Sequence, residues 1–182
     1  MATRNILKDG DRGLTKKSRI VNDFNKRLHI LLDDMNETLI EANGLGLAAP
    51  QVGVLRRAAL IVDINTEAES FEEQIIELIN PEIISCGGEQ TGSEGCLSVP
   101  GVYGIVTRPD FVKVRAQDRY GKVFEFECNE LTARAVCHEI DHLNGIIFTS
   151  VAERLLTEEE LAELAEQNRY AGDEEEEEAA QE

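Results

Sequence analysis

Two histidines stand four residues apart in the segment His138-Glu139-Ile140-Asp141-His142. On an α-helix, side chains four residues apart project from one face, so both imidazoles can reach the same metal ion. A glutamate beside the first histidine can then act as a general base on a water molecule that the metal activates. The segment therefore predicts a hydrolytic metal site; the alternative is two solvent-exposed histidines on a charged helix.

A catalytic metal needs a third protein ligand and an open coordination position. Cys96, in the segment Glu94-Gly95-Cys96-Leu97-Ser98, is one candidate, although a free cysteine is more often a buried core residue. In a zincin-type peptidase the ligand would come later, from Glu160 or Glu163, but only 40 residues follow His142 and the last of them are acidic. A structural metal in a binding protein is disfavoured by Glu139 and by the open position, because structural sites usually have four protein ligands.

Hydrophobic periodicity predicts the elements that must position these residues. A period of 3.6 predicts a helix over 23–43 that Gly44 ends, and a second helix over 130–144 that carries both histidines. A last helix begins at Thr157, where Thr-Glu-Glu-Glu fits a capping box with Glu160. Strands are predicted over 58–64, over 75–79 with Asn80-Pro81 as the stop, and in a hairpin over 111–128. This order of elements predicts an α+β fold.

Composition and charge limit the class of protein. The chain has 182 residues, 42% of them hydrophobic, which is enough for one domain with a core. No apolar run is long enough to cross a membrane, and the first twenty residues lack the apolar region of a secretory signal, so we expect a cytoplasmic protein. The four cysteines form no CxxC pair, and we expect them to be reduced.

The net charge of −18 is unevenly spread, because residues 157–182 hold 12 acidic residues and one basic residue. Nothing resembles the clustered lysines and arginines of a DNA-binding protein. We expect a catalytic domain over 1–156, a C-terminal helix over 157–172 and a disordered acidic tail over 173–182.

Three segments together resemble the signature motifs of the bacterial peptide deformylases, in a type I-like form. They are Gly44-Leu45-Gly46-Leu47-Ala48-Ala49-Pro50-Gln51, Glu94-Gly95-Cys96-Leu97-Ser98 and His138-Glu139-Ile140-Asp141-His142-Leu143-Asn144-Gly145. They follow the family's order and spacing, and the resemblance covers residues 1–156. It implies a metal-dependent hydrolase that removes the formyl group from the N-terminal formylmethionine of nascent polypeptides and releases formate. For the fold, we expect antiparallel β-sheets around a central metal-binding helix, with an N-terminal and a C-terminal helix.

The resemblance also implies a role for individual residues. Cys96, His138 and His142 are the expected metal ligands, with water as the fourth. Glu139 is similar to the family's acid/base residue, and Gln51 and the backbone N–H of Leu97 are similar to its oxyanion donors. The Gly46 carbonyl is expected to accept a hydrogen bond from the formamide N–H, and an extended peptide could pair with this segment. The expected substrate-pocket residues are Glu94, Gly95, Leu131, Arg134 and Ala135.

Several neighbours carry weaker expectations. The stem of Arg134 should pack while its head reaches solvent. Asp141 either supports the metal ligands or is solvated, and we expect the second. Glu94 should support the Cys96 loop or pair with Arg108. Cys137 and Glu130 stand where the family often has Gln and Gly, and Cys137 is not expected to be a ligand.

The expected cofactor is one divalent metal ion. One thiolate and two imidazoles suit Zn²⁺, Fe²⁺, Co²⁺ or Ni²⁺, and the resemblance implies Fe²⁺ in the cell, with Zn²⁺ as an occupant after purification. The expected partners are formylmethionyl peptides and nascent chains. Some family members approach the ribosome through a basic C-terminal helix, but the acidic segment 157–182 would repel ribosomal RNA, so any ribosome contact should be transient.

Overall fold

The protein folds around one buried helix that two antiparallel sheets enclose. The computed structural model describes residues 2–64, 66 and 70–163. The larger sheet has the strand order β1-β2-β3-β6-β7 and the smaller one β4-β5-β8, and every pairing in them is antiparallel. The predicted α+β class is confirmed. The elements are α1 (Lys26–Ala42), α2 (Glu130–Leu143), short 3-10 helices at Ala49–Val52 and Phe148–Ser150, and strands β1 (Gly46–Ala48), β2 (Ala58–Val62), β3 (Ile75–Gly87), β4 (Gln90–Cys96), β5 (Val99–Arg108), β6 (Phe111–Gln117), β7 (Val123–Asn129) and β8 (Arg154–Leu155).

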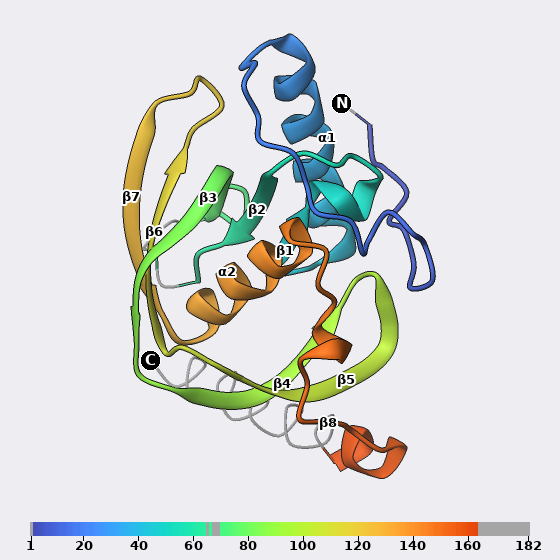
Figure 1. Ribbon diagram of the computed structural model, residues 1–182. Coiled ribbons are helices and arrows are strands. Elements are labelled where there is room, and N and C mark those ends of the chain that lie inside the picture. The colour runs from blue at the N-terminus through green and yellow to red at the C-terminus, as the bar shows by residue number, and fades with distance from the viewer. Residues whose placement is uncertain (1, 65, 67–69, 164–182) are drawn as a thin grey trace, which may run out of the picture.

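Helix α2 lies in the middle of the molecule, between the larger sheet and the β4–β5 hairpin (Figure 1). Ten of its fourteen residues are buried. Its Val136 packs in a cluster with Val112 of β6 and Cys128 of β7, and its Leu143 packs with Ala48 and Ala59 of β1 and β2. Any polar side chain in the middle of α2 is therefore held in the interior.

Helix α1 covers the other face of β1 and β2. Its Leu32, Met35 and Leu39 are fully buried in one cluster with Leu47 and Leu60. The helix was predicted correctly, but its ends differ from the prediction. It begins at Lys26 because the Asn25 side chain accepts hydrogen bonds from the backbone N–H groups of Arg27 and Leu28. It ends at Ala42, because the next residue, Asn43, has a left-handed φ of 49°.

Strand β3 corrects a second prediction. Asn80-Pro81 was expected to stop the strand, but β3 continues to Gly87 through a bulge between Ile79 and Glu82. Asn80 has a φ of 51° there, and its side chain bonds to the backbone of Val21. The bulge accommodates the proline, which has no N–H for the ladder.

The predicted hairpin over 111–128 is confirmed, since β6 and β7 pair from Phe111–Asn129 to Gln117–Val123. The β4–β5 hairpin, which carries Cys96, was not predicted, because its glycine-rich strands do not alternate clearly.

At the C-terminal end, Thr157 and Glu160 form the predicted capping box. The Thr157 N–H donates to the Glu160 carboxylate at 2.8 Å, and the Glu160 N–H donates to Thr157 Oγ1 at 3.2 Å. Most of the predicted helix 157–172 and all of the predicted tail 173–182 lie outside the described residues. None of the helices in the described part of the chain is long and apolar enough to span a membrane.

Candidate metal centre

The structure brings the three predicted ligands together from two elements. Cys96 ends β4, and His138 and His142 lie one turn apart on α2. One donor atom from each of the three residues lies within 4.8 Å of the others. Cys96 Sγ is 3.2 Å from His142 Nε2, and the two imidazole rings are 4.9 Å apart. All four cysteines are free thiols, as predicted, and Cys137 is buried outside this group.

The chemistry of these groups fits a divalent cation. A thiol and two imidazoles are a donor set that zinc and iron-group ions favour. Burial and the neighbouring His138 lower the pKa of His142 to about 3, which keeps this ring in the neutral, metal-binding form. Beside the ligands, Glu139 Oε2 is buried with no hydrogen-bond partner. An unpartnered buried carboxylate oxygen costs free energy unless a cation or a bound polar molecule lies next to it.

Glu94 fixes the orientation of His138. Its Oε2 lies 3.1 Å from His138 Nδ1, so this nitrogen carries the donated proton and Nε2 faces the site. Burial lowers the pKa of His138, but hydrogen bonds to Cys96 and Glu94 raise it more, to about 10. A metal ion at Nε2 competes with the proton that would otherwise bind there and make the ring positively charged.

Glu94 is itself held by two arginines, the buried Arg134 and the partly buried Arg108. Arg108 Nε donates to it at 2.9 Å and Arg134 Nη1 at 2.9 Å, and Arg108 Nη1 also donates to Asp141 at 2.6 Å. Burial alone would raise the pKa of Glu94, but His138 and Arg108 lower it to about 2. The predicted pairing of Glu94 with Arg108 is confirmed. Two expectations were wrong. Asp141 is not simply solvated but pairs with Arg108. The Arg134 guanidinium does not reach solvent but is buried, where it donates to Glu94 and to the carbonyl of Val106.

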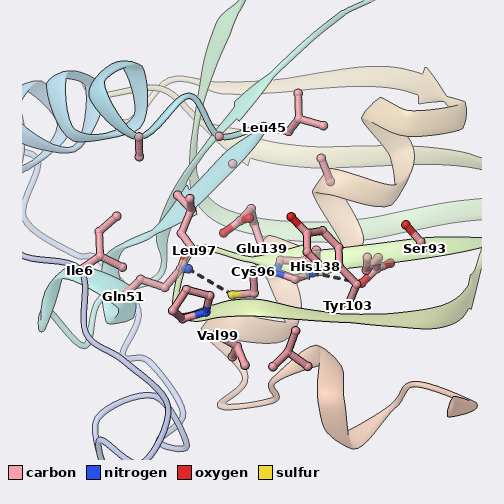
Figure 2. Close-up of a pocket in the computed structure, with 18 of the residues that line it drawn as sticks. Ile6, Leu45, Gln51, Ser93, Cys96, Leu97, Val99, Tyr103, His138 and Glu139 are labelled. Carbon is pink, nitrogen blue, oxygen red and sulfur yellow. Dashed lines mark hydrogen bonds and ion pairs between the residues drawn. The ribbon is translucent and has the colours of Figure 1, made fainter. Parts of the chain in front are cut away.

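Glu139 lies next to β1. Burial raises the pKa of its carboxyl to about 7. A Cβ atom at Gly46 would lie only 2.7 Å from Glu139 Cγ, so a larger residue in β1 would displace this side chain. The carboxyl is thus held in the pocket beside the three donor atoms, as Figure 2 shows for Glu139, Cys96 and His138.

Gln51 presents its amide NH₂ group to the cysteine (Figure 2). Its Oε1 accepts a hydrogen bond from the Ala48 N–H at 2.8 Å, which fixes which end of the amide faces the site. Its Nε2 lies 3.2 Å from Ser98 Oγ and 3.6 Å from Cys96 Sγ. Leu97 follows Cys96 directly in the turn between β4 and β5 and lines the same pocket.

A pocket of about 600 Å³ opens beside these groups. Leu131 and Ala135 of α2 form an apolar part of its wall. Glu94 and Arg134 also line it, but their polar atoms are already hydrogen-bonded to each other. Sequence reasoning missed other wall residues, which no local pattern marks. The predicted lining residues that the structure places here are Gly46, Glu94, Gly95, Leu131, Arg134 and Ala135, and the missed ones include Ile6, Lys8, Leu45, Val102 and Tyr103.

Comparison with known proteins gives one family throughout. The model of the family described as polypeptide deformylase matches residues 3–158. A peptide deformylase from Caldicellulosiruptor bescii is 53% identical over 173 residues, which cover 95% of this chain and 97% of that protein. The crystal structure of a peptide deformylase from Legionella pneumophila matches with a TM-score of 0.76 and 39% identity, covering 92% of this chain and 98% of that one. A Met-Ala-Ser-bound class I type b peptide deformylase from Acinetobacter baumannii matches with a TM-score of 0.75 and 32% identity, covering 82% of this chain and 98% of that one. Matches of this extent and identity show that the chain belongs to the peptide deformylase family.

Proposed function

We propose that this protein hydrolyses the formyl group from the N-terminal formylmethionine of nascent polypeptides and releases formate. One divalent metal ion, held by Cys96, His138 and His142, is its cofactor. The observation that carries the proposal is the convergence of these three donors beside the unpartnered, buried carboxylate oxygen of Glu139.

A formamide carbonyl is a poor electrophile, and water at neutral pH is a poor nucleophile. A cation held by Cys96, His138 and His142 would supply the Lewis acidity that polarises the carbonyl and makes water a stronger acid. Glu139 is the group that accepts the proton of the attacking water and delivers it to the leaving amine. Its burial beside Gly46 keeps it in place for both transfers.

Gln51 and Leu97 stabilise the oxyanion that forms when water attacks. The Gln51 NH₂ group is turned towards the site because its oxygen is occupied by the Ala48 N–H. The backbone N–H of Leu97 is the second donor. Each such fixed donor contributes about 3 kcal/mol to the lowering of the barrier.

The substrate binds as an extended peptide with its methionine in the pocket. Leu131 and Ala135 contact the methionine side chain, and Gly95 and Gly46 allow the peptide backbone to approach closely. Strand β1 pairs on one side with β2 and stands at the edge of the larger sheet, so the Gly46 carbonyl can accept the formamide N–H by strand addition. The Met-Ala-Ser bound to the Acinetobacter baumannii relative supports a methionine-first peptide.

Iron is the proposed metal in the cell. Zn²⁺, Co²⁺ and Ni²⁺ suit the same donors. With Fe²⁺ bound, activity should fade in air as the metal or Cys96 is oxidised, and unchanged activity after aerobic storage would contradict iron.

We further propose that the protein acts in the cytoplasm, on chains leaving the ribosome. Contact with the ribosome is expected to be transient, because residues 157–182 carry 12 acidic residues and one basic residue. Ribosome binding should be equal or stronger when these residues are removed. Weaker binding after truncation would contradict the repulsion.

The decisive experiment is anaerobic purification, metal analysis and an assay of formate release from formyl-Met-Ala-Ser. We expect one metal ion per chain and stoichiometric formate, and no release of acetate from acetyl-Met-Ala-Ser, which serves as the matched control. A metal-loaded protein that releases no formate but cleaves internal peptide bonds would favour a zincin-type peptidase instead.

A further inference from the structure

Three consecutive residues of the N-terminal segment bond to the 3-10 helix that carries Gln51 and to the cysteine loop, the turn of Leu97 and Ser98 that follows Cys96. The Leu7 N–H donates to the Gln51 carbonyl at 2.8 Å, and the Asp9 N–H donates to the Ser98 carbonyl at 2.8 Å. Between them, the Lys8 ammonium donates to the Leu97 carbonyl at 2.8 Å. Residues 8 and 9 therefore hold the cysteine loop while residue 7 holds Gln51, and the contact to Leu97 is made by a charged side chain.

The peptide group between Leu97 and Ser98 connects this ammonium to the sulfur of Cys96. Its carbonyl oxygen accepts from Lys8, and its N–H, which belongs to Ser98, donates to Cys96 Sγ at 3.4 Å. Both ends are parts of one delocalised amide. A cation at the oxygen draws electron density from the nitrogen, so the N–H becomes a stronger donor to the sulfur.

We propose that Lys8 is a positioning residue that, through the Leu97–Ser98 peptide, reduces the electron donation of Cys96 to the bound metal. This inference rests on the proposed function, because it takes Cys96 as a metal ligand. Hydrogen bonds to a ligating sulfur tune a metal centre. A thiolate donates more charge than an imidazole and so reduces the Lewis acidity of the cation, and Lys8 offsets part of that reduction.

The charge of Lys8 is what distinguishes this role from simple support of the loop. The amides of Leu7 and Asp9 already hold Gln51 and Ser98 by backbone bonds that no substitution at residue 8 removes. The Lys8 side chain is exposed, so replacing it leaves no buried cavity. Because water screens an exposed ammonium, the effect on rate should be that of one modest hydrogen bond.

The test compares the cobalt-loaded wild type with Lys8→Met, Lys8→Gln and Lys8→Arg. The readout is the sulfur-to-cobalt charge-transfer band, because its energy reports the electron density on the sulfur. In Lys8→Met and Lys8→Gln we expect the band to move to longer wavelength and kcat to fall about 2- to 10-fold. Lys8→Arg keeps the charge and should restore both. Lys17→Met, which removes an exposed lysine from the same segment, is the matched control and should change neither.

The outcomes separate this inference from the proposed function. An unmoved band in folded, fully loaded Lys8→Met would overturn the role of Lys8. An equal shift in Lys8→Arg and Lys8→Met would overturn it too, because the shape of the side chain and not its charge would then matter. A wild-type protein with no sulfur-to-cobalt band would instead overturn Cys96 as a ligand, and with it the proposed metal centre.

Discussion

Gly46 of β1 and Glu139 of α2 are in such close contact that residue 46 can carry no side chain without moving the glutamate. A Cβ atom there would lie 2.7 Å from Glu139 Cγ and 2.8 Å from its Cδ. The edge strand proposed to receive the substrate and the proposed general base thus fix one another across the pocket.

Gly46→Ala should therefore lower kcat by about 100-fold, because a displacement of about 1 Å at a catalytic group has costs of that order. Metal content should not change, since none of the three donors moves. The measurement is formate release together with metal analysis. Gly87→Ala, where a Cβ atom would meet nothing within 4 Å, is the control and should keep full activity. Full activity in Gly46→Ala would mean that the position of Glu139 is not critical.

Glu139→Gln should bind metal normally and lose turnover by about 10²- to 10⁴-fold, the range for removal of a general base. Glutamine has nearly the same shape, so the effect isolates the loss of proton transfer. The exposed Glu127→Gln is the control. If the variant keeps turnover at unchanged metal content, Glu139 does not take part in the mechanism.

Cys96→Ser should weaken metal binding by more than about 100-fold, since losing only an outer partner of a ligand costs about 10- to 100-fold. Chelator competition followed by metal analysis measures this. The exposed thiol Cys86 supplies the control variant, Cys86→Ser, which should bind metal as the wild type does. Undiminished metal binding in Cys96→Ser would point to a different ligand set, such as that of a zincin.

Glu94→Gln should destabilise the fold as well as the site. It removes the charge that His138, the buried Arg134 and the partly buried Arg108 share. Breaking a buried pair on one side costs about 3–5 kcal/mol in the free energy of unfolding, or roughly 6–20 °C in Tm for a chain of this size. Thermal unfolding measures it. Glu125→Gln removes an exposed partner of Arg115 and should lower Tm much less, because water screens an exposed ion pair. An equal drop in Tm in the two variants would show that burying the ion pairs of Glu94 does not increase their contribution to stability.

Asp34 should make part of the stability depend on pH. A hydrogen bond from the Ala2 N–H and an ion pair with Arg4 lower its pKa, against the effect of burial. A lowered folded-state pKa means that this contribution is complete above the ordinary value of 3.8 and is lost as the pH falls below it. The difference in free energy of unfolding between wild type and Asp34→Asn should therefore shrink between about pH 6 and about pH 3. A difference that stays constant over this range would contradict the lowered pKa.

The parts of the fold that were predicted from sequence are those with local causes. The spacing of His138 and His142 needs only a helix to bring two imidazoles together, and the alternation in β6 and β7 needs only a sheet. Asn80 shows the limit of a local rule. Its proline neighbour predicts the end of a strand, but the hydrogen bonds of Asn80 to Val21, 59 residues away, hold a bulge instead.

The supporting partners of the candidate site could not be predicted for the same reason. Arg134 was expected in solvent because arginine usually is, but Glu94, 40 residues away in sequence, binds its head inside the protein. Lys8 contacts Leu97 across 89 residues of sequence, and neither residue has a neighbour that marks the contact. Such burial and pairing depend on contacts between residues that are distant in sequence, so no local sequence pattern predicts them.

The hydrogen bonds that residues 2–9 make determine where a tag can be attached. They tie the beginning of the chain to α1 at Asp34 and to the cysteine loop at Leu97 and Ser98. We expect an affinity tag or fusion partner attached ahead of residue 2 to disturb these contacts and, through them, the candidate metal centre. Tags are therefore better attached after the last residue, and preparations tagged at opposite ends should be compared before their rates are.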